Sequence, residues 1–230
     1  TLTCANVTSE PVRAILRGFS APVVLEFGYS NAQLLKLLAS DADPFNRWEA
    51  GQRLMLRDAI ECIAADAGSI RAKPLNDACI EAMRGVLRHP ALDAAFKELV
   101  LTLPSETYIA EQLDVVDPQR VHAVREAMRA QLAQALFADW EWTYKTHHDN
   151  GAYQPDPVSS GRRALAGLAL SQLCLAARTS GDSVWPGKTL QRFKDAGNMT
   201  DRFNALNALV SSGHALAAGA IARFHALFKD

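Results

Sequence analysis

Three neighbouring polar residues, His147, His148 and Asp149, form the densest group of possible metal ligands in the sequence. Imidazole and carboxylate groups are common ligands of zinc, and helical zinc sites place two histidines four residues apart. Adjacent residues on a helix instead point about 100° apart, so two neighbouring histidines rarely bind one ion. Histidine also suits the negatively polarised C-terminal end of a helix. We therefore interpret this group as a solvated helix end.

A second pair, His122 and Glu126, has the four-residue spacing that places both side chains on one helical face. No third ligand lies near it in the sequence, so a surface pair is favoured over a metal site. The carboxylates Asp114, Asp117 and Asp139 show no periodicity that would bring them together. Asp117 precedes a proline and is better explained as a helix N-cap.

Three aromatic residues, Trp140, Trp142 and Tyr144, gather toward the end of one predicted helix. They could form a binding platform, but large aromatic side chains more often fill helix–helix contacts, which we favour here. No basic residues alternate with them, as they would in a nucleic-acid platform.

Motifs that carry chemistry are absent from the sequence. It contains no H-E-x-x-H, G-x-x-x-x-G-K-[ST], G-x-G-x-x-G or G-x-S-x-G. We therefore assign no catalytic, cofactor-binding or metal-binding residue to this chain.

The composition indicates an ordinary globular protein. Of 230 residues, 49% are hydrophobic and 21% are charged, and the formal net charge is −1. Because basic residues are not in excess, we expect neither nucleic acid nor an anionic membrane surface as a partner. The most apolar run, residues 164–177, is shorter than the roughly 20 residues that span a bilayer, so it predicts a buried helix.

The cysteines and the first residues bear on the compartment. No signal peptide is visible at the start, and no pair of cysteines has the C-x-x-C spacing. We expect four buried free thiols and a cytoplasmic location. The cysteines are Cys4, Cys62, Cys79 and Cys174.

From Ser30 onward, apolar residues recur with the period of a helix. Asp-Pro pairs at residues 43–44, 117–118 and 156–157 predict helix starts, because aspartate caps the free N–H groups and proline fits the first helical position. The second pair should open the longest helix, running to Trp140, and residues 162–178 should be central because they are apolar on nearly every face. The predicted helices begin near residues 34, 43, 79, 92, 105, 117, 162, 200 and 214.

The expected fold is therefore mostly α: a superhelix of about ten packed helices, with no clean sequence repeat. The first residues differ from the rest. Val23, Leu25 and Phe27 alternate with Val24 and Glu26 as in a strand, and no strand signal follows. The chain thus predicts a strand without a visible sheet.

Four stretches, in one order along the chain, resemble bacterial aminopeptidase N, a group within the zinc-dependent M1 metallopeptidase family. They are LRGFSAPVVLEF (16–27), DPFNRWEAGQRL (43–54), LTLPSETYIAEQLDVVDPQRVHAVREAMR (101–129) and AGNMTDRFNAL (196–206). The first resembles the segment that closes the family's small β-sandwich domain, and the others resemble its C-terminal helical domain. The resemblance implies that residues 1–29 are terminal strands of that sandwich. Residues 30–230 would be the helical superhelical domain, truncated at its C-terminal end.

Members of this family remove N-terminal residues from peptides, with zinc held by H-E-x-x-H and a later glutamate. The resemblance implies that such a zinc site belongs to a catalytic domain of the parent protein, and that this domain is the partner of the present chain. The chain itself would cap and gate the active site, without chemistry of its own, over peptide substrates. An exposed apolar surface should then lie on the concave side or beside residues 1–28, where the catalytic domain packs.

A different class of function stays open. The chain could be a stand-alone helical-repeat module that binds another protein. The unpaired apolar strand argues against this hypothesis, because an exposed edge invites aggregation.

Overall fold

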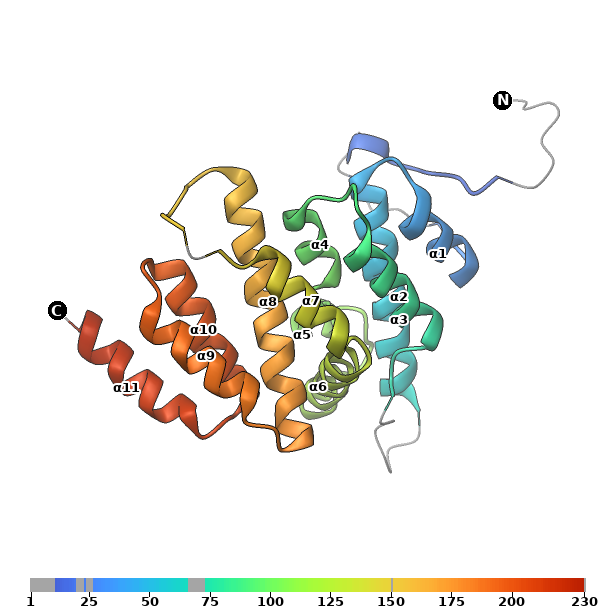
Figure 1. Cartoon of the computed structure of the whole chain (residues 1–230). Helices are drawn as coiled ribbons and strands as arrows, with labels where there is room; N and C mark the ends of the chain where they lie inside the picture. The colour runs from blue at the N-terminus through green and yellow to red at the C-terminus, as the bar shows by residue number, and fades with distance from the viewer. Residues whose placement is uncertain (1–10, 20–22, 24–26, 66–72, 150, 230) are drawn as a thin grey trace.

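The computed structural model describes residues 11–19, 23, 27–65, 73–149 and 151–229 (Figure 1). In these ranges the chain forms eleven α-helices, one short 3-10 helix and no strand, which confirms the mostly α prediction. The helices are η1 (Arg17–Phe19), α1 (Asn31–Ser40), α2 (Pro44–Ala64), α3 (Asp77–Arg88), α4 (Ala94–Leu101), α5 (Glu106–Ala110), α6 (Pro118–Ala135), α7 (Phe137–His147), α8 (Pro157–Ser180), α9 (Val184–Asp195), α10 (Met199–Ser212) and α11 (Leu216–Phe228).

Figure 1 shows the helices as an array that runs from α1 and α2 at one end to α10 and α11 at the other. Helix α8 occupies the middle and packs against α4, α6, α7, α9 and α10. The prediction that the apolar segment 162–178 is central is thus confirmed. Since α8 contacts helices on both sides, it joins the two halves of the array.

The three Asp-Pro helix starts are confirmed. Asp43 accepts a hydrogen bond from the backbone N–H of Asn46, and Asp156 accepts one from Ser159. Asp117 accepts from the backbone N–H groups of two residues in the first turn of α6. Each carboxylate satisfies N–H groups that have no partner within the helix.

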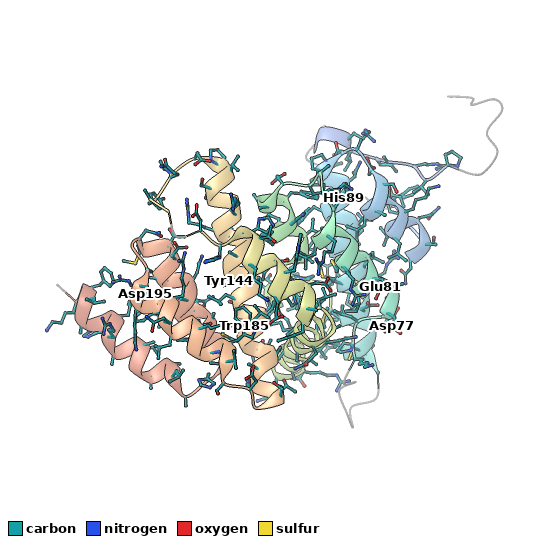
Figure 2. All side chains as sticks on the ribbon, in the orientation of Figure 1. Asp77, Glu81, His89, Tyr144, Trp185 and Asp195 are labelled. Carbon is teal, nitrogen blue, oxygen red and sulfur yellow. The ribbon has the colours of Figure 1, made fainter. Side chains whose placement is uncertain are left out.

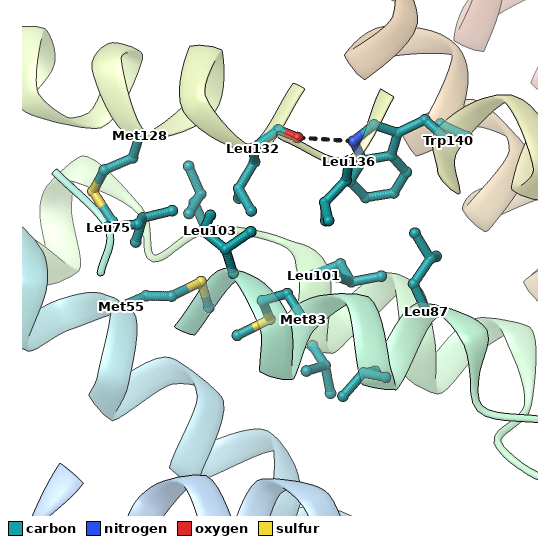
Figure 3. Packing of buried hydrophobic residues seen from close by; sticks show 14 of the residues in the cluster. Met55, Leu75, Met83, Leu87, Leu101, Leu103, Met128, Leu132, Leu136 and Trp140 are labelled. Atoms are coloured by element: carbon teal, nitrogen blue, oxygen red, sulfur yellow. Dashed lines mark hydrogen bonds between the residues drawn. The ribbon is translucent and has the colours of Figure 1, made fainter. Parts of the chain in front are cut away.

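The long helix predicted from residue 118 to Trp140 is instead divided into α6 and α7. The break is at Leu136, with φ −109° and ψ 21°. Trp140 donates its indole N–H to the carbonyl of Leu132 at 3.1 Å, and that carbonyl also accepts the N–H of Leu136 (Figure 3). A side-chain donor competing for a helical carbonyl is a known cause of a kink. The longest helix is therefore α8, with 24 residues against 18 in α6.

The sequence analysis missed helix α9. Its start carries no side-chain cap, and Pro186 lies in the first turn. The signal that was present is the spacing of Trp185, Thr189 and Phe193, all buried, which places one residue per turn on the same face.

The core between α2, α3, α4 and α6 is built from long aliphatic and sulfur-containing side chains (Figure 3). Two polar side chains of α6 tie other segments to it. Arg120 donates to the carbonyls of Cys62, Ile63 and Ala65 at the end of α2. Gln131 donates to the carbonyl of Leu75 and accepts from its N–H, both at 2.8 Å. These bonds satisfy backbone groups that the helices leave unpaired.

The helix α8 approaches its neighbours closely at two glycines. A Cβ atom on Gly161 would lie 2.8 Å from the backbone N of Ala95 in α4. A Cβ atom on Gly167 would lie 2.7 Å from the side chain of Asn204 in α10. At Gly161 the neighbour is backbone and cannot move aside, so a larger residue would push α8 and α4 apart, whereas at Gly167 the Asn204 side chain would have to shift.

The predicted strand and its sandwich can be compared with the structure only in part. The described residues between 11 and 29 form η1 and irregular extended chain. The centre of the predicted strand, residues 24–26, and residues 1–10 lie outside the described residues, so the division at residue 29 stays a prediction. Three of the four cysteines, Cys62, Cys79 and Cys174, are buried free thiols as expected, and Cys4 lies outside the described residues.

Candidate functional site

The group His147–His148–Asp149 is at the end of α7, but it is not a solvated helix end. Both histidines are half-buried, and their rings contact different aromatic neighbours. The ring of His148 stacks on Tyr144, with centroids 5.0 Å apart, whereas that of His147 meets the edge of Trp142 at 6.3 Å. Burial lowers the pKa of both histidines. The positive charge of Lys97 lowers the pKa of His147 further, and that of Arg192 lowers the pKa of His148 further.

His122 and Glu126 do not pair with each other, and each contacts a different residue. His122 Nδ1 lies 2.8 Å from a carboxylate oxygen of Glu106 in α5, and Glu126 accepts a hydrogen bond from Arg129. The prediction that His122 lies at the surface was right, because 61% of its side chain is exposed. The predicted partner, Glu126, was wrong, because the carboxylate that contacts His122 is that of Glu106 in α5.

The carboxylates Asp114, Asp117 and Asp139 do not meet. Asp117 caps α6, Asp114 is exposed in the preceding loop, and Asp139 is buried between α7 and α3. Within the described residues, no group of three or more histidine, cysteine or acidic side chains could hold a metal ion. The donor set of these residues therefore does not fit zinc.

The aromatic residues of α7 serve packing, as predicted. Trp140 is fully buried, and the ring of Tyr144 meets that of Trp185 edge to face, with centroids 5.5 Å apart. Figure 2 labels both residues. Trp142 stacks under the guanidinium of Arg88, with Cζ 4.2 Å from the ring centroid. These contacts join α7 to α9 and to α3.

A groove lined in part by Ile15, Leu16, Val23 and Tyr29 is the candidate interaction site. It encloses about 480 Å³ between α1, α2, α5 and the segment that precedes α1. Its rim carries two exposed apolar side chains, Val23 and Tyr108, which are 56% and 38% exposed. The lining residues are Ile15, Leu16, Val23, Tyr29, Leu34, Leu37, Phe45, Asn46, Glu49, Ala50, Arg53, Leu56, Arg57, Ile60, Tyr108 and Gln112.

Two arginines of α2 fasten the N-terminal wall of this groove. Arg53 donates to a carboxylate oxygen of Glu49 at 2.7 Å and to the carbonyl of Phe27 at 3.3 Å. Arg57 donates to the carbonyl of Tyr29 at 2.7 Å and to the side chain of Asn31 at 2.9 Å. The segment 27–31 is thus held against α2 by charge-assisted hydrogen bonds, which are stronger than neutral ones.

The opposite wall of the groove is formed by Tyr108 of α5 and by Gln112. Burial raises the pKa of the Tyr108 hydroxyl, and the negative charge of Glu49 raises it further. The charged side chains of the lining are Glu49, Arg53 and Arg57, and Arg53 donates to Glu49. The groove therefore offers mainly its exposed apolar side chains to a partner, and its lining contains no nucleophile with an adjacent base.

Sequence reasoning did not single out Arg53, Arg57 or Tyr108. The groove forms from segments more than fifty residues apart, and no local period reveals such a juxtaposition. The available signal was that Arg53 lies in the stretch 43–54 and Tyr108 in the stretch 101–129, both of which resemble a known family.

Comparison with known proteins identifies the group to which this fold belongs. Residues 31–230 match the family described as "Domain of unknown function (DUF3458_C) ARM repeats". The chain belongs to this ARM-repeat family. In armadillo-type arrays, each helical unit contacts mainly its neighbours, which agrees with the row of helices around α8.

Proteins named aminopeptidase N are similar to this ARM-repeat chain over most of its length. The aminopeptidase N of Caulobacter vibrioides is 34% identical over 220 residues, which is 96% of this chain and 25% of that protein. The Escherichia coli aminopeptidase N is 32% identical over 90% of this chain and 23% of its own length. That of Haemophilus influenzae is 31% identical over 88% and 22%. The predicted resemblance is therefore confirmed, and the chain spans about a quarter of these relatives.

A solved structure supports the fold. The crystal structure of Legionella pneumophila aminopeptidase A in complex with aspartic acid superimposes with a TM-score of 0.79. The match covers 98% of this chain and 26% of that one, at 24% identity. At this identity the likeness shows a shared fold.

None of the described helices of the ARM-repeat chain is both long and apolar enough to cross a membrane.

Proposed function

We propose that this ARM-repeat chain is the non-catalytic helical region of an aminopeptidase that removes N-terminal residues from peptides. The observation that carries the proposal is the 31–34% identity to three proteins named aminopeptidase N. The chemistry, including a zinc ion, would belong to a separate catalytic domain, because the donor groups of the described residues do not fit zinc. A cytoplasmic location is part of the same proposal.

The role of the chain would be to cap the active site and to limit entry to short or unfolded peptides. The groove between α2 and α5 supports this role, because exposed apolar side chains border it. It is also lined by Ile15, Leu16 and Val23, on the side where a surface for the catalytic domain was expected. We infer that an apolar face of the catalytic domain docks here.

An assay of the parent enzyme and of this chain tests the proposal. The purified chain, with zinc added, should not hydrolyse an aminoacyl-anilide above the rate in buffer. The parent enzyme should hydrolyse short peptides and leave the N-termini of folded proteins intact. A parent enzyme without this region should lose that restriction. Turnover by the chain alone would contradict a non-catalytic role, and unchanged selectivity without the region would contradict gating.

The alternative, a stand-alone protein-binding module, fits the ARM-repeat match equally well. The length of the natural gene product separates the two. A reading frame with H-E-x-x-H upstream of these residues supports the aminopeptidase, and one without it supports the module.

A further inference from the structure

Two small cavities, each with charged residues in its lining, adjoin one another where the end of α7 meets α8 and α10. They enclose about 20 and 30 Å³. Four residues line both: His147, Asp149, Arg163 and Asp201. His148 lines only the first of them. Each volume suits a single water molecule, which needs about 10–15 Å³ and two to four polar partners.

Three buried polar atoms of this lining have no hydrogen-bond partner among the described residues. They are Nε2 of His147, Nδ1 of His148 and Nε of Arg163. A buried polar group left without a hydrogen bond costs about 1–3 kcal/mol, so such groups are rarely left unsatisfied in folded proteins. Three of them around one pair of cavities indicate that something polar satisfies them there.

The charges of the lining indicate what that partner is. Arg163 and Arg192 face two carboxylates, Asp149 and Asp201, and Arg192 already donates to Asp201 at 2.9 Å. An anion would meet the carboxylates, and a cation would meet the arginines. The Nε–H of Arg163 requires an acceptor, whereas a histidine nitrogen donates or accepts according to its tautomer. A neutral molecule that both donates and accepts meets all of these conditions.

We propose that each cavity holds one ordered water molecule. In the first cavity, the water accepts from the Nε–H of Arg163 and bonds to Nδ1 of His148. In the second, the water bonds to Nε2 of His147 and accepts from an Nη–H of the same arginine. The two waters join the C-terminal end of α7 to α8 and α10, and so connect the two halves of the array. This inference goes beyond the proposed function and does not depend on it.

A crystal structure of the full chain that carries these residues, at a resolution that shows ordered solvent, tests the proposal. We expect one density peak in each cavity, within hydrogen-bond distance of the Arg163 guanidinium. Cavities without density, or side chains that pair directly and close them, would overturn it. So would an anomalous peak after a bromide soak, because that outcome identifies an anion site.

Two variants sharpen this test. His148→Phe should remove the peak from the first cavity and keep the peak in the second, which His148 does not line. Arg163→Met should remove both. Arg178→Met is the matched control, because Arg178 lies near the other end of α8 and contacts the carbonyl of Ser212. Both peaks should persist there. Peaks that persist in Arg163→Met would overturn the assignment of the waters, and the wild-type structure decides it even if a variant fails to fold.

Discussion

Arg88 of α3 donates to Asp139 of α7, with Nε 2.7 Å from Oδ1. Arg84, one turn earlier, donates to the other oxygen of the same carboxylate at 3.1 Å. The carboxylate of Asp139 thus binds two arginines of the neighbouring helix. Arg84 also contacts the exposed Glu81. This arrangement joins α3 to α7 and fixes the orientation of Trp142 under Arg88.

Replacing Asp139 by alanine should lower the free energy of unfolding by about 2–3 kcal/mol, because two arginines lose a charged acceptor that is shielded from water. Urea-induced unfolding followed by circular dichroism measures the loss. Glu81→Ala is the control: 65% of the Glu81 side chain is exposed, so its removal should cost less than about 1 kcal/mol. Equal losses in both variants would show that the bridge between α3 and α7 has no special role.

Two glycines in helices should respond oppositely to alanine. Gly161→Ala should destabilise the protein by about 1–3 kcal/mol, because the new methyl group would press on the backbone of Ala95. Gly85→Ala should stabilise it by about 0.5–1 kcal/mol, because nothing lies within 4 Å of the new Cβ and glycine weakens a helix. Thermal unfolding of the two variants measures both changes. A neutral Gly161→Ala variant would contradict the close packing of α8 on α4.

Stability should fall with acidification through the histidines at the end of α7. Burial holds the pKa of His147 and His148 below the ordinary value of 6.5. As the pH falls below 6.5, the unfolded chain therefore binds protons that the folded chain does not, and the free energy of unfolding decreases until the folded-state pKa is passed. Folded His148 faces Arg192 of α9, Asp201 of α10 and its neighbour Asp149.

Chemical denaturation at a series of pH values measures this dependence. The variant His148→Phe should show a smaller loss between pH 6.5 and lower pH than the wild type. Identical pH profiles for this variant and the wild type would rule out the proposed contribution of His148.

Local sequence chemistry predicted most of the helices and could not predict the junctions between them. Asp43, Asp117 and Asp156 act within one turn of chain, so their role as caps was readable from the sequence. The break at Leu136 depends on an indole that bonds to a carbonyl eight residues earlier, a choice that periodicity does not reveal. The partner of His122 comes from α5, sixteen residues away. Helix α9 was missed because its start lacks a capping side chain.

The candidate site, too, could be predicted only in part from the sequence. The stretches that resemble a peptidase family were visible, but the groove between them was not, because α2, α5 and the segment before α1 come together only in the fold. The burial of His147 and His148 was likewise hidden. Their surroundings are supplied by α4, α8, α9 and α10, which are distant in sequence.

The docking of this chain on a catalytic domain is the central claim, and a binding measurement tests it most directly. The chain and the remainder of the parent enzyme are prepared separately and mixed in an analytical ultracentrifuge. We expect a one-to-one complex, weakened at least about tenfold by Tyr108→Ser in the groove, because truncating a large aromatic side chain at an interface commonly costs more than about 1 kcal/mol of binding free energy. The control Val158→Ser changes an apolar side chain that is 72% exposed and lies outside the groove, and it should leave binding unchanged. No complex, or equal binding by wild type and Tyr108→Ser, would contradict the account.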